Sequence, residues 1–332
     1  MSTDFPNSVI QTEGLRKSFG RTGFGETEVL RGIDLAVPEG AIYALVGANG
    51  AGKTTLIKVL MNILRATAGR ASVLGWDSRT LTGDRFCSIG YVSENQEMPD
   101  AMTVGAMLDY TRVFYPMWDR ELERALIQQF DLPLGRKLRH LSRGMRMKAA
   151  FVSSLAYRPA LMVLDEPLSG LDPLVRDELI DGLLERAPET TIFLSSHDLA
   201  EIESFSSHVG YLEDGRILFS EEMTALTARF REVTITLAEP IAPPALLPAA
   251  LPLEWLLPEA VDHVVRFVHS AYRGAESERE LRERFPTART IESEPMPLRA
   301  IFLAMARSGR KQRGAQRGPQ PPQLAEKERV DA

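Results

Sequence analysis

Short apolar runs alternate with longer segments of helical periodicity over the first two thirds of the chain. Three of these runs are Ala41–Val46, Leu161–Leu164 and Thr190–Leu194. They lack the alternation of polar and apolar side chains that marks a half-exposed strand, so each is predicted to be a strand covered on both faces. Because helical segments lie between them, the pattern predicts an α/β fold with a mostly parallel sheet.

A clearer alternation of polar and apolar residues precedes these runs. It covers Ser8–Leu15 and Val29–Val37, and such alternation is typical of strands with one exposed face. We therefore expect an antiparallel sheet at one edge of the fold, with a loop around Gly20–Gly25.

A helical stretch is predicted from about Val104 to Phe130, within a helical subdomain of about residues 95–157. It carries a cluster of aromatic and methionine side chains that has two interpretations. The cluster could fill a small helical core, or part of it could be a docking surface for a partner, which the adaptable methionine side chain suits. Its members are Met107, Tyr110, Phe114, Tyr115, Met117 and Trp118.

The pattern changes at about Glu221, which predicts a first domain over residues 1–220 and a small α+β appendage over 221–306. The last segment, 307–332, is polar and is expected to be a disordered tail; its basic residues either are solvated or contact anionic lipid or RNA. The elements predicted in the appendage are strands at Val233–Leu237 and His263–Val268, separated by the proline-rich Pro240–Pro258, and helices at Ser277–Phe285 and Pro297–Ala306.

Composition narrows the class of protein. The 332 residues are 44% hydrophobic and 25% charged, which is ordinary for a globular chain of about two domains. A formal net charge of −6 gives no general basic character that would indicate nucleic acid. The single cysteine, Cys87, excludes an internal disulfide and fits a reducing cytosol. Neither a signal peptide nor a membrane-spanning segment is predicted, because the most apolar stretch, Ile241–Pro258, is broken by prolines.

A glycine-rich loop supplies the first candidate chemistry. Residues 47–54 fit G-x-x-x-x-G-K-[ST], directly after one predicted strand and before a helix. Its glycines let backbone N–H groups surround a polyphosphate at the helix N-terminus. Lys53 would reach the β- and γ-phosphates, and the Thr54 hydroxyl would ligate Mg²⁺. The residues expected to bind nucleotide here are Gly47, Asn49, Gly50, Ala51, Gly52, Lys53, Thr54 and Thr55.

Two adjacent carboxylates, Asp165 and Glu166, end the apolar run at Leu161–Leu164. At the carboxyl end of a parallel strand they would point into the crevice where ligands bind. Asp165 is predicted to hold Mg²⁺ through oxygen. Glu166 is predicted to orient or deprotonate the attacking water.

With these motifs in order, residues 8–220 resemble the nucleotide-binding subunit of ATP-binding cassette (ABC) transporters. The segment Leu141–Met145 resembles the family signature L-S-G-G-Q, with Arg143 in place of a glycine and Met145 in place of the glutamine. The resemblance implies a P-loop ABC cassette with a mostly parallel sheet, an antiparallel edge sheet and a helical subdomain. It also implies that Ser142 and Gly144 contact the γ-phosphate of ATP bound to the opposite subunit.

Further motifs follow the family order. Ser169–Asp172 resembles the loop that couples two sites across a dimer, which implies that role for Asp172; as the residue before Pro173, Asp172 would also cap a helix. His197, after the run Thr190–Ser196, resembles the histidine that contacts the γ-phosphate.

Two positions are less typical of the family. Phe19 occupies the place of the aromatic residue that stacks on adenine, although a role in the core is the alternative. Glu94, within Gly90–Glu94, stands where the family has a glutamine; a carboxylate there could ligate Mg²⁺, and Gln96 is the other candidate for the position.

The resemblance implies an ATPase that uses ATP and Mg²⁺ to power a membrane transporter of the export type. Two copies, or a pseudo-dimer, would enclose ATP and act on a separate integral membrane permease, so the chain is expected to be peripheral on the cytoplasmic face of the membrane. One alternative is a soluble ABC ATPase acting on nucleic acid or ribosomes, a partner that the sequence does not favour. Another is a regulatory subunit with weakened hydrolysis, which Arg143, Met145 and Glu94 suggest.

Overall fold

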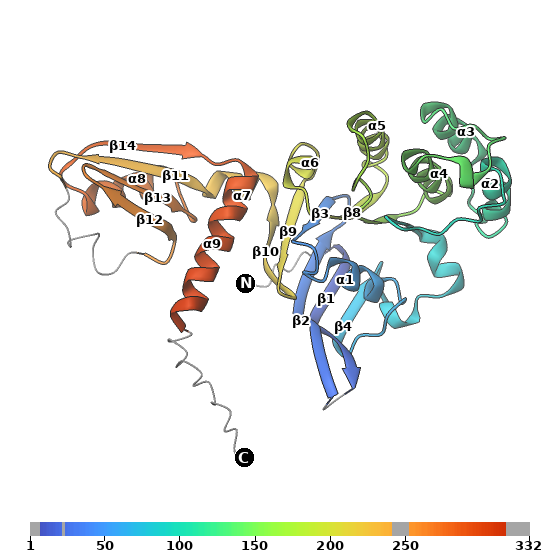
Figure 1. The fold of residues 1–332 in the computed structure, drawn as a ribbon, viewed down its shortest axis with the longest axis horizontal. Helices are drawn as coiled ribbons and strands as arrows, with labels where there is room; N and C mark the ends of the chain where they lie inside the picture. The colour runs from blue at the N-terminus through green and yellow to red at the C-terminus, as the bar shows by residue number, and fades with distance from the viewer. Residues whose placement is uncertain (1–6, 22–23, 241–251, 317–332) are drawn as a thin grey trace, which may run out of the picture. The chain divides into compact units, whose positions relative to one another are not determined.

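The structure, a computed structural model, describes residues 7–21, 24–240 and 252–316 (Figure 1). The chain divides into one unit that ends at Met223 and a second that begins at Thr224. Each unit has a sheet and a hydrophobic core of its own. Among the helices that the structure describes, none is both long enough and apolar enough to span a membrane.

The first unit is built on a mostly parallel sheet with the strand order β10-β9-β3-β8-β7-β6. The strands from β9 to β6 pair in parallel, and β10 pairs with β9 in antiparallel. Every residue of β3, β7 and β8 is buried, as the absence of polar alternation predicted. The bounds are β3 (Ile42–Val46), β6 (Ile89–Ser93), β7 (Leu161–Asp165), β8 (Thr191–Ser196), β9 (His208–Glu213) and β10 (Arg216–Glu222).

A second, antiparallel sheet has the order β2-β1-β4-β5 and contains the predicted edge strands. Ile10 pairs with Val37 and Leu15 with Ile33, and these four apolar side chains are fully buried. They pack in one core with residues of β3 and α1, which fixes the helix after the phosphate loop. The bounds are β1 (Ser8–Arg21), β2 (Phe24–Pro38), β4 (Ala68–Val73), β5 (Trp76–Asp77) and α1 (Lys53–Leu60).

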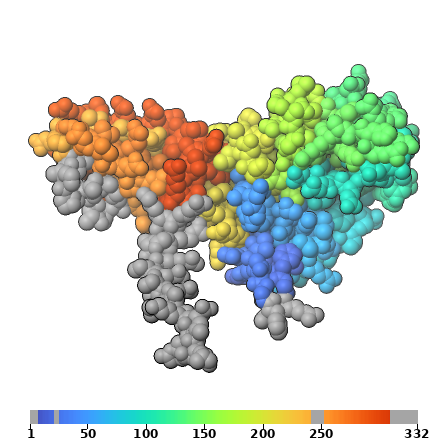
Figure 2. Space-filling view, in the orientation of Figure 1, coloured from blue at the N-terminus to red at the C-terminus, as the bar shows by residue number. Residues whose placement is uncertain are grey.

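The helical stretch predicted between Val104 and Phe130 is two helices in the structure. Pro116 lies in the gap, where it lacks a backbone N–H and disfavours a helical conformation of the residue before it. The Asp119 carboxylate then accepts hydrogen bonds from the backbone N–H groups of Glu121 and Leu122, which starts the next helix. The helices of this region, green in Figure 2, are α2 (Val104–Arg112), α3 (Arg120–Gln129) and α4 (Arg143–Leu155).

The aromatic and methionine cluster is partly buried in the helical region and partly exposed. The Tyr115 ring stacks on Tyr157 with 3.9 Å between ring centroids, and Met107 is buried. In contrast, Tyr110 is 58% exposed and Met117 is 74% exposed. The core interpretation is therefore confirmed for part of the cluster, and the docking surface stays a prediction for the exposed members.

Two further helices follow the strand ends that carry the acidic pair and the histidine. α5 (Pro173–Leu184) begins after Asp172, and α6 (Leu199–Glu203) begins after Asp198. In each case the aspartate side chain accepts a hydrogen bond from a backbone N–H of the new helix, which satisfies one unpaired donor of the first turn.

The second unit contains the antiparallel sheet β12-β13-β11-β14, two strands more than the sequence indicated. β12 was missed because it carries Pro258 within the proline-rich piece, and β14 because its polar sequence gives no apolar alternation. α9 continues past the predicted end at Ala306, so residues 307–316 are helical rather than a tail, and the rest of the expected tail lies outside the described residues. The bounds are α7 (Met223–Arg229), β11 (Arg231–Leu237), β12 (Trp255–Val261), β13 (Val264–His269), α8 (Ala275–Arg284), β14 (Ala288–Pro295) and α9 (Leu298–Gln316).

Candidate functional site

The phosphate loop joins β3 to α1 and depends on its glycines. Gly52 has φ +113°, and a Cβ atom there would lie 3.0 Å from the Leu30 side chain. Gly50 also has a positive φ. L side chains rarely adopt this backbone conformation, so the loop geometry requires glycine at both positions.

Lys53 is the first residue of α1, and its side chain is 5% exposed. The Nζ atom donates to the backbone oxygen of Gly47 at 2.7 Å and lies 3.0 Å from Glu166 Oε1. A buried ammonium group needs such partners, because burying an unpaired charge is costly. Lys53 therefore spans the loop and meets the acidic strand end.

Asp165 and Thr54 are brought together at the end of β7. Thr54 Oγ1 donates to Asp165 Oδ1 at 3.1 Å, and Ser195 Oγ donates to the same oxygen at 2.8 Å. Ser195 Oγ also accepts from the backbone N–H of Glu166 at 2.9 Å. Ser195 was not among the predicted site residues; the available signal was a hydroxyl at the end of the strand next to β7.

Glu166 links the lysine to the histidine. Its Oε2 atom lies 2.7 Å from His197 Nδ1, and its side chain is 12% exposed. The backbone of Glu166 has φ +52°, a left-handed conformation that is uncommon outside glycine and tends to occur at functional sites. The hydrogen bond from its N–H to Ser195 and the two side-chain partners hold the carboxylate in this position.

Oxygen donors for a metal are few and well defined here. Among the described residues, no group of three or more His, Cys, Asp or Glu side chains could hold a metal ion. The Thr54 hydroxyl and the Asp165 carboxylate are hard oxygen ligands of the kind Mg²⁺ prefers, with phosphate oxygens and water completing its shell. This donor set fits a metal that arrives with a nucleotide rather than an all-protein metal site.

Burial changes the acidity of two groups near this site. Burial, and secondarily the negative charge of Asp165, raises the pKa of Tyr91. Burial also raises the pKa of Glu201, which the nearby Arg176 guanidinium counteracts; these two side chains form an ion pair of 2.9 Å. Glu201 is thus held by Arg176 in this structure.

Ser142, Gly144 and Asp172 form a separate group. Ser142 Oγ accepts from the backbone N–H of Met145 at 3.2 Å and caps α4, while Asp172 caps α5 through Val175 N–H. Gly144 faces the Val175 side chain, where a Cβ atom would lie only 2.9 Å away. None of the hydrogen bonds or ion pairs found within the described ranges joins these three residues to the phosphate loop.

Two predicted residues have unexpected surroundings. The Glu94 carboxylate accepts from Arg143 and Ser169, whereas the Thr54 hydroxyl donates to Asp165. Gln96 Oε1 accepts from the Ser93 N–H. Phe19 is 40% exposed, so the alternative of a core role is wrong.

A phosphate loop between a buried strand and a helix, with a carboxylate pair at the end of another strand of the same sheet, defines a P-loop nucleoside triphosphatase. Residues 30–169 match the family model described as "ABC transporter". An uncharacterized ABC transporter ATP-binding protein of Synechocystis sp. is 34% identical over 64% of this chain, and the match spans 62% of that protein. The bacitracin transport ATP-binding protein of Enterococcus faecalis is 30% identical over 68% of this chain and 73% of its own.

Solved structures agree. An ATP-binding subunit of an ABC transporter is 27% identical with a TM-score of 0.60, over 67% of this chain and 92% of that one. The chain therefore belongs to the ABC transporter ATP-binding family.

Proposed function

We propose that this chain is the ATP-binding and ATP-hydrolysing subunit of an ABC transporter. The observation that carries the proposal is the Glu166 carboxylate, held by Lys53 at 3.0 Å and by His197 at 2.7 Å beside the phosphate loop. Phosphoryl transfer to water requires a cation that binds the phosphate oxygens and a base that positions the water. Lys53 can leave the Glu166 carboxylate to bind phosphate, and Glu166 is then free to act as that base.

The phosphate loop would bind the nucleotide through its backbone N–H groups and Lys53. When a polyphosphate enters, Lys53 would pair with it and release Glu166 for the attacking water. The partly exposed ring of Phe19, with Lys17 Nζ 4.8 Å from its centroid, offers a face on which adenine could stack.

Thr54 and Asp165 would hold Mg²⁺ together with the nucleotide. The bound ion would supply charge neutralisation on the phosphate oxygens. Ser195 holds the Asp165 carboxylate in place through the 2.8 Å hydrogen bond, and Glu166 would orient and deprotonate the water.

The separate position of Ser142, Gly144 and Asp172 supports a site shared between two copies. Ser142 and Asp172 are exposed, and their bonds in this chain are helix caps. In a head-to-tail dimer, these residues would complete the phosphate site of the opposite copy. ATP would then favour the closed dimer because it has more contacts in that state.

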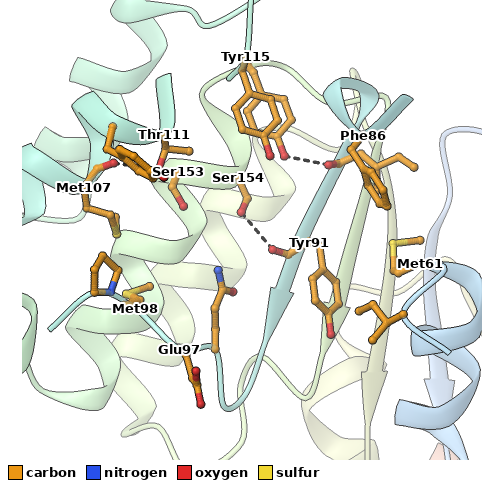
Figure 3. A pocket seen from close by; sticks show the side chains of 16 residues that line it. Met61, Phe86, Tyr91, Glu97, Met98, Met107, Thr111, Tyr115, Ser153 and Ser154 are labelled. Atoms are coloured by element: carbon orange, nitrogen blue, oxygen red, sulfur yellow. Dashed lines mark hydrogen bonds between the residues drawn. The ribbon is translucent and has the colours of Figure 1, made fainter. Parts of the chain in front are cut away.

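A groove between the sheet and the helical region is the candidate docking site for a cytoplasmic segment of an integral membrane permease. It has a volume of about 400 Å³, and Figure 3 shows Ser154 directed toward Tyr91, whose backbone oxygen accepts its hydrogen bond at 3.3 Å. Apolar side chains dominate the rim, which suits an apolar protein segment. The lining residues that can be followed in Figure 3 include Met61, Phe86, Tyr91, Met98, Met107 and Tyr115.

We expect Tyr110→Asp to reduce recovery of the permease with this chain at least about tenfold, because it places a charge on the exposed apolar rim. Tyr110 lines the groove and is 58% exposed. The measurement is co-purification with the multi-span membrane protein that the wild-type chain recovers. Leu218→Asp, on β10 and 45% exposed, is the matched control and should retain the complex; equal recovery with both variants would argue against the groove.

We propose that the transporter exports a hydrophobic or peptide-like compound. The support is the relative named for bacitracin transport. The test is Mg²⁺-dependent phosphate release by the chain together with its permease in vesicles, stimulated by the exported compound. Phosphate release that needs RNA or ribosomes instead would overturn the transport function, and absence of release under all these conditions would overturn the ATPase itself.

A further inference from the structure

The Glu94 carboxylate joins three segments that are distant in sequence. Its Oε1 atom accepts from Arg143 Nη2 at 2.7 Å and from Ser169 Oγ at 3.3 Å. Glu94 follows β6, Arg143 is the first residue of α4, and Ser169 lies in the segment between β7 and α5. One side chain thus ties the start of the signature helix to the loops that leave two neighbouring strands.

Gly170 gives the Arg143 guanidinium its space. Gly170 has φ +65°, and a Cβ atom there would lie 2.8 Å from Arg143 Nη1. A side chain at position 170 would therefore displace the guanidinium as well as strain the backbone. The Arg143 side chain is therefore packed against the segment between β7 and α5.

The charge of Arg143 explains why it needs Glu94. A helix N-terminus carries partial positive charge, so a cation in the first turn is unfavourable. The first turn of α4 contains no acidic residue, and Glu94 supplies the negative charge from another segment. The side chains are 47% and 34% exposed, and a pair this exposed adds little to overall stability. We expect the pair to affect the orientation of the N-terminus of α4 instead.

Glu94 is also hydrogen-bonded to the strand end beside the phosphate loop. Its backbone N–H donates to the backbone oxygen of Asp165 at 2.9 Å. The Asp165 carboxylate in turn accepts the Thr54 hydroxyl at 3.1 Å. A contiguous set of contacts therefore runs from the phosphate loop through Asp165 and Glu94 to Arg143, the residue after Ser142.

We infer that Glu94 and Arg143 are a positioning pair that orients Ser142 and the N-terminus of α4 relative to the strand end carrying Asp165 and Glu166. The inference rests on the proposed function, because orientation of Ser142 matters only if that residue completes a second copy's ATP site. The pair should set the rate of turnover but not the affinity of a single phosphate loop for ATP. Glu94 then acts through Arg143 and not as a ligand of Mg²⁺.

The test compares Glu94→Gln, Arg143→Gln and the charge exchange Glu94→Arg with Arg143→Glu. Each single variant should lower kcat about 5- to 20-fold with KM for ATP unchanged within about twofold. The exchange should restore at least about half of the wild-type kcat, because it rebuilds the ion pair and places an acidic residue at the start of α4. Rescue by the exchange is a result that loss of a metal ligand would not give.

Arg146→Gln is the matched control. Arg146 is also in the first turn of α4, and its ion pair with Asp100 has a similar length of 3.0 Å but does not involve Glu94. It should keep kcat within about twofold of the wild type.

Three outcomes would overturn the pair. These are unchanged kcat in both single variants, no recovery in the exchange, or a raised Mg²⁺ requirement confined to Glu94→Gln. If the wild type itself hydrolyses no ATP with its permease, the proposed function fails instead, and the two failures are thereby distinguished.

Discussion

Glu166→Gln is expected to abolish nearly all ATP turnover while leaving ATP binding intact. Glutamine keeps the size of the side chain but cannot accept a proton from water. Removal of a positioned general base costs about 10²- to 10⁴-fold in rate. Binding should persist, since the loop glycines and Lys53 are untouched and Lys53 no longer has a carboxylate competing with the phosphates.

The measurement pairs phosphate release with the mass of the ATP-bound species in solution. The variant should accumulate as an ATP-stabilised dimer, because in the proposed dimer the γ-phosphate would bridge the two copies and would no longer be removed. Glu189→Gln is the control: Glu189 forms a 2.7 Å ion pair with Arg158 outside the site and is 60% exposed, so its loss should leave the rate within about twofold. Wild-type turnover in Glu166→Gln would disprove the assignment of the base.

Local signals explain which parts of this fold the sequence predicts well. β3, β7 and β8 are continuous apolar runs because both of their faces are covered, and the loop before Lys53 has a fixed glycine and lysine spacing. β12 and β14 in the second unit give no such signal. β14 alternates between intermediate and exposed positions and is held mainly by its pairing with β11, a partner that local periodicity does not reveal.

The same distinction applies to the site. Asp165 and Glu166 are predicted from a strand end, because the carboxyl ends of parallel strands meet at one edge, whereas His197 is predicted from its resemblance to the family's histidine. Ser195 is less visible, because a serine at a strand end becomes informative only when β8 is known to lie beside β7. The Glu94–Arg143 pair joins residues 49 positions apart, and each looks like an isolated departure from the family pattern until the structure places them together.

Lys53→Ala is expected to remove most of the affinity for ATP. The side chain is 5% exposed and its ammonium group lies 2.7 Å from Gly47 O and 3.0 Å from Glu166 Oε1. Truncation removes the cation that would meet the phosphates and leaves the Glu166 carboxylate facing them. Loss of one partner of a buried charge pair costs about 2–5 kcal/mol, which corresponds to about a 30-fold to several-thousand-fold rise in Kd.

Direct titration with ATP, and the rise in Tm that ATP causes, both measure this effect. ATP at about 100 times its Kd stabilises the wild type by about 2.7 kcal/mol, and Lys53→Ala should lose most of that stabilisation. Lys58→Ala is the matched control, because Lys58 is half-buried on the same helix α1 but one turn beyond the loop; it should bind ATP within about twofold of the wild type. Among the described residues, no other lysine or arginine side chain pairs with Glu166 and could replace Lys53 there. Wild-type affinity in Lys53→Ala would therefore mean that the nucleotide is held elsewhere.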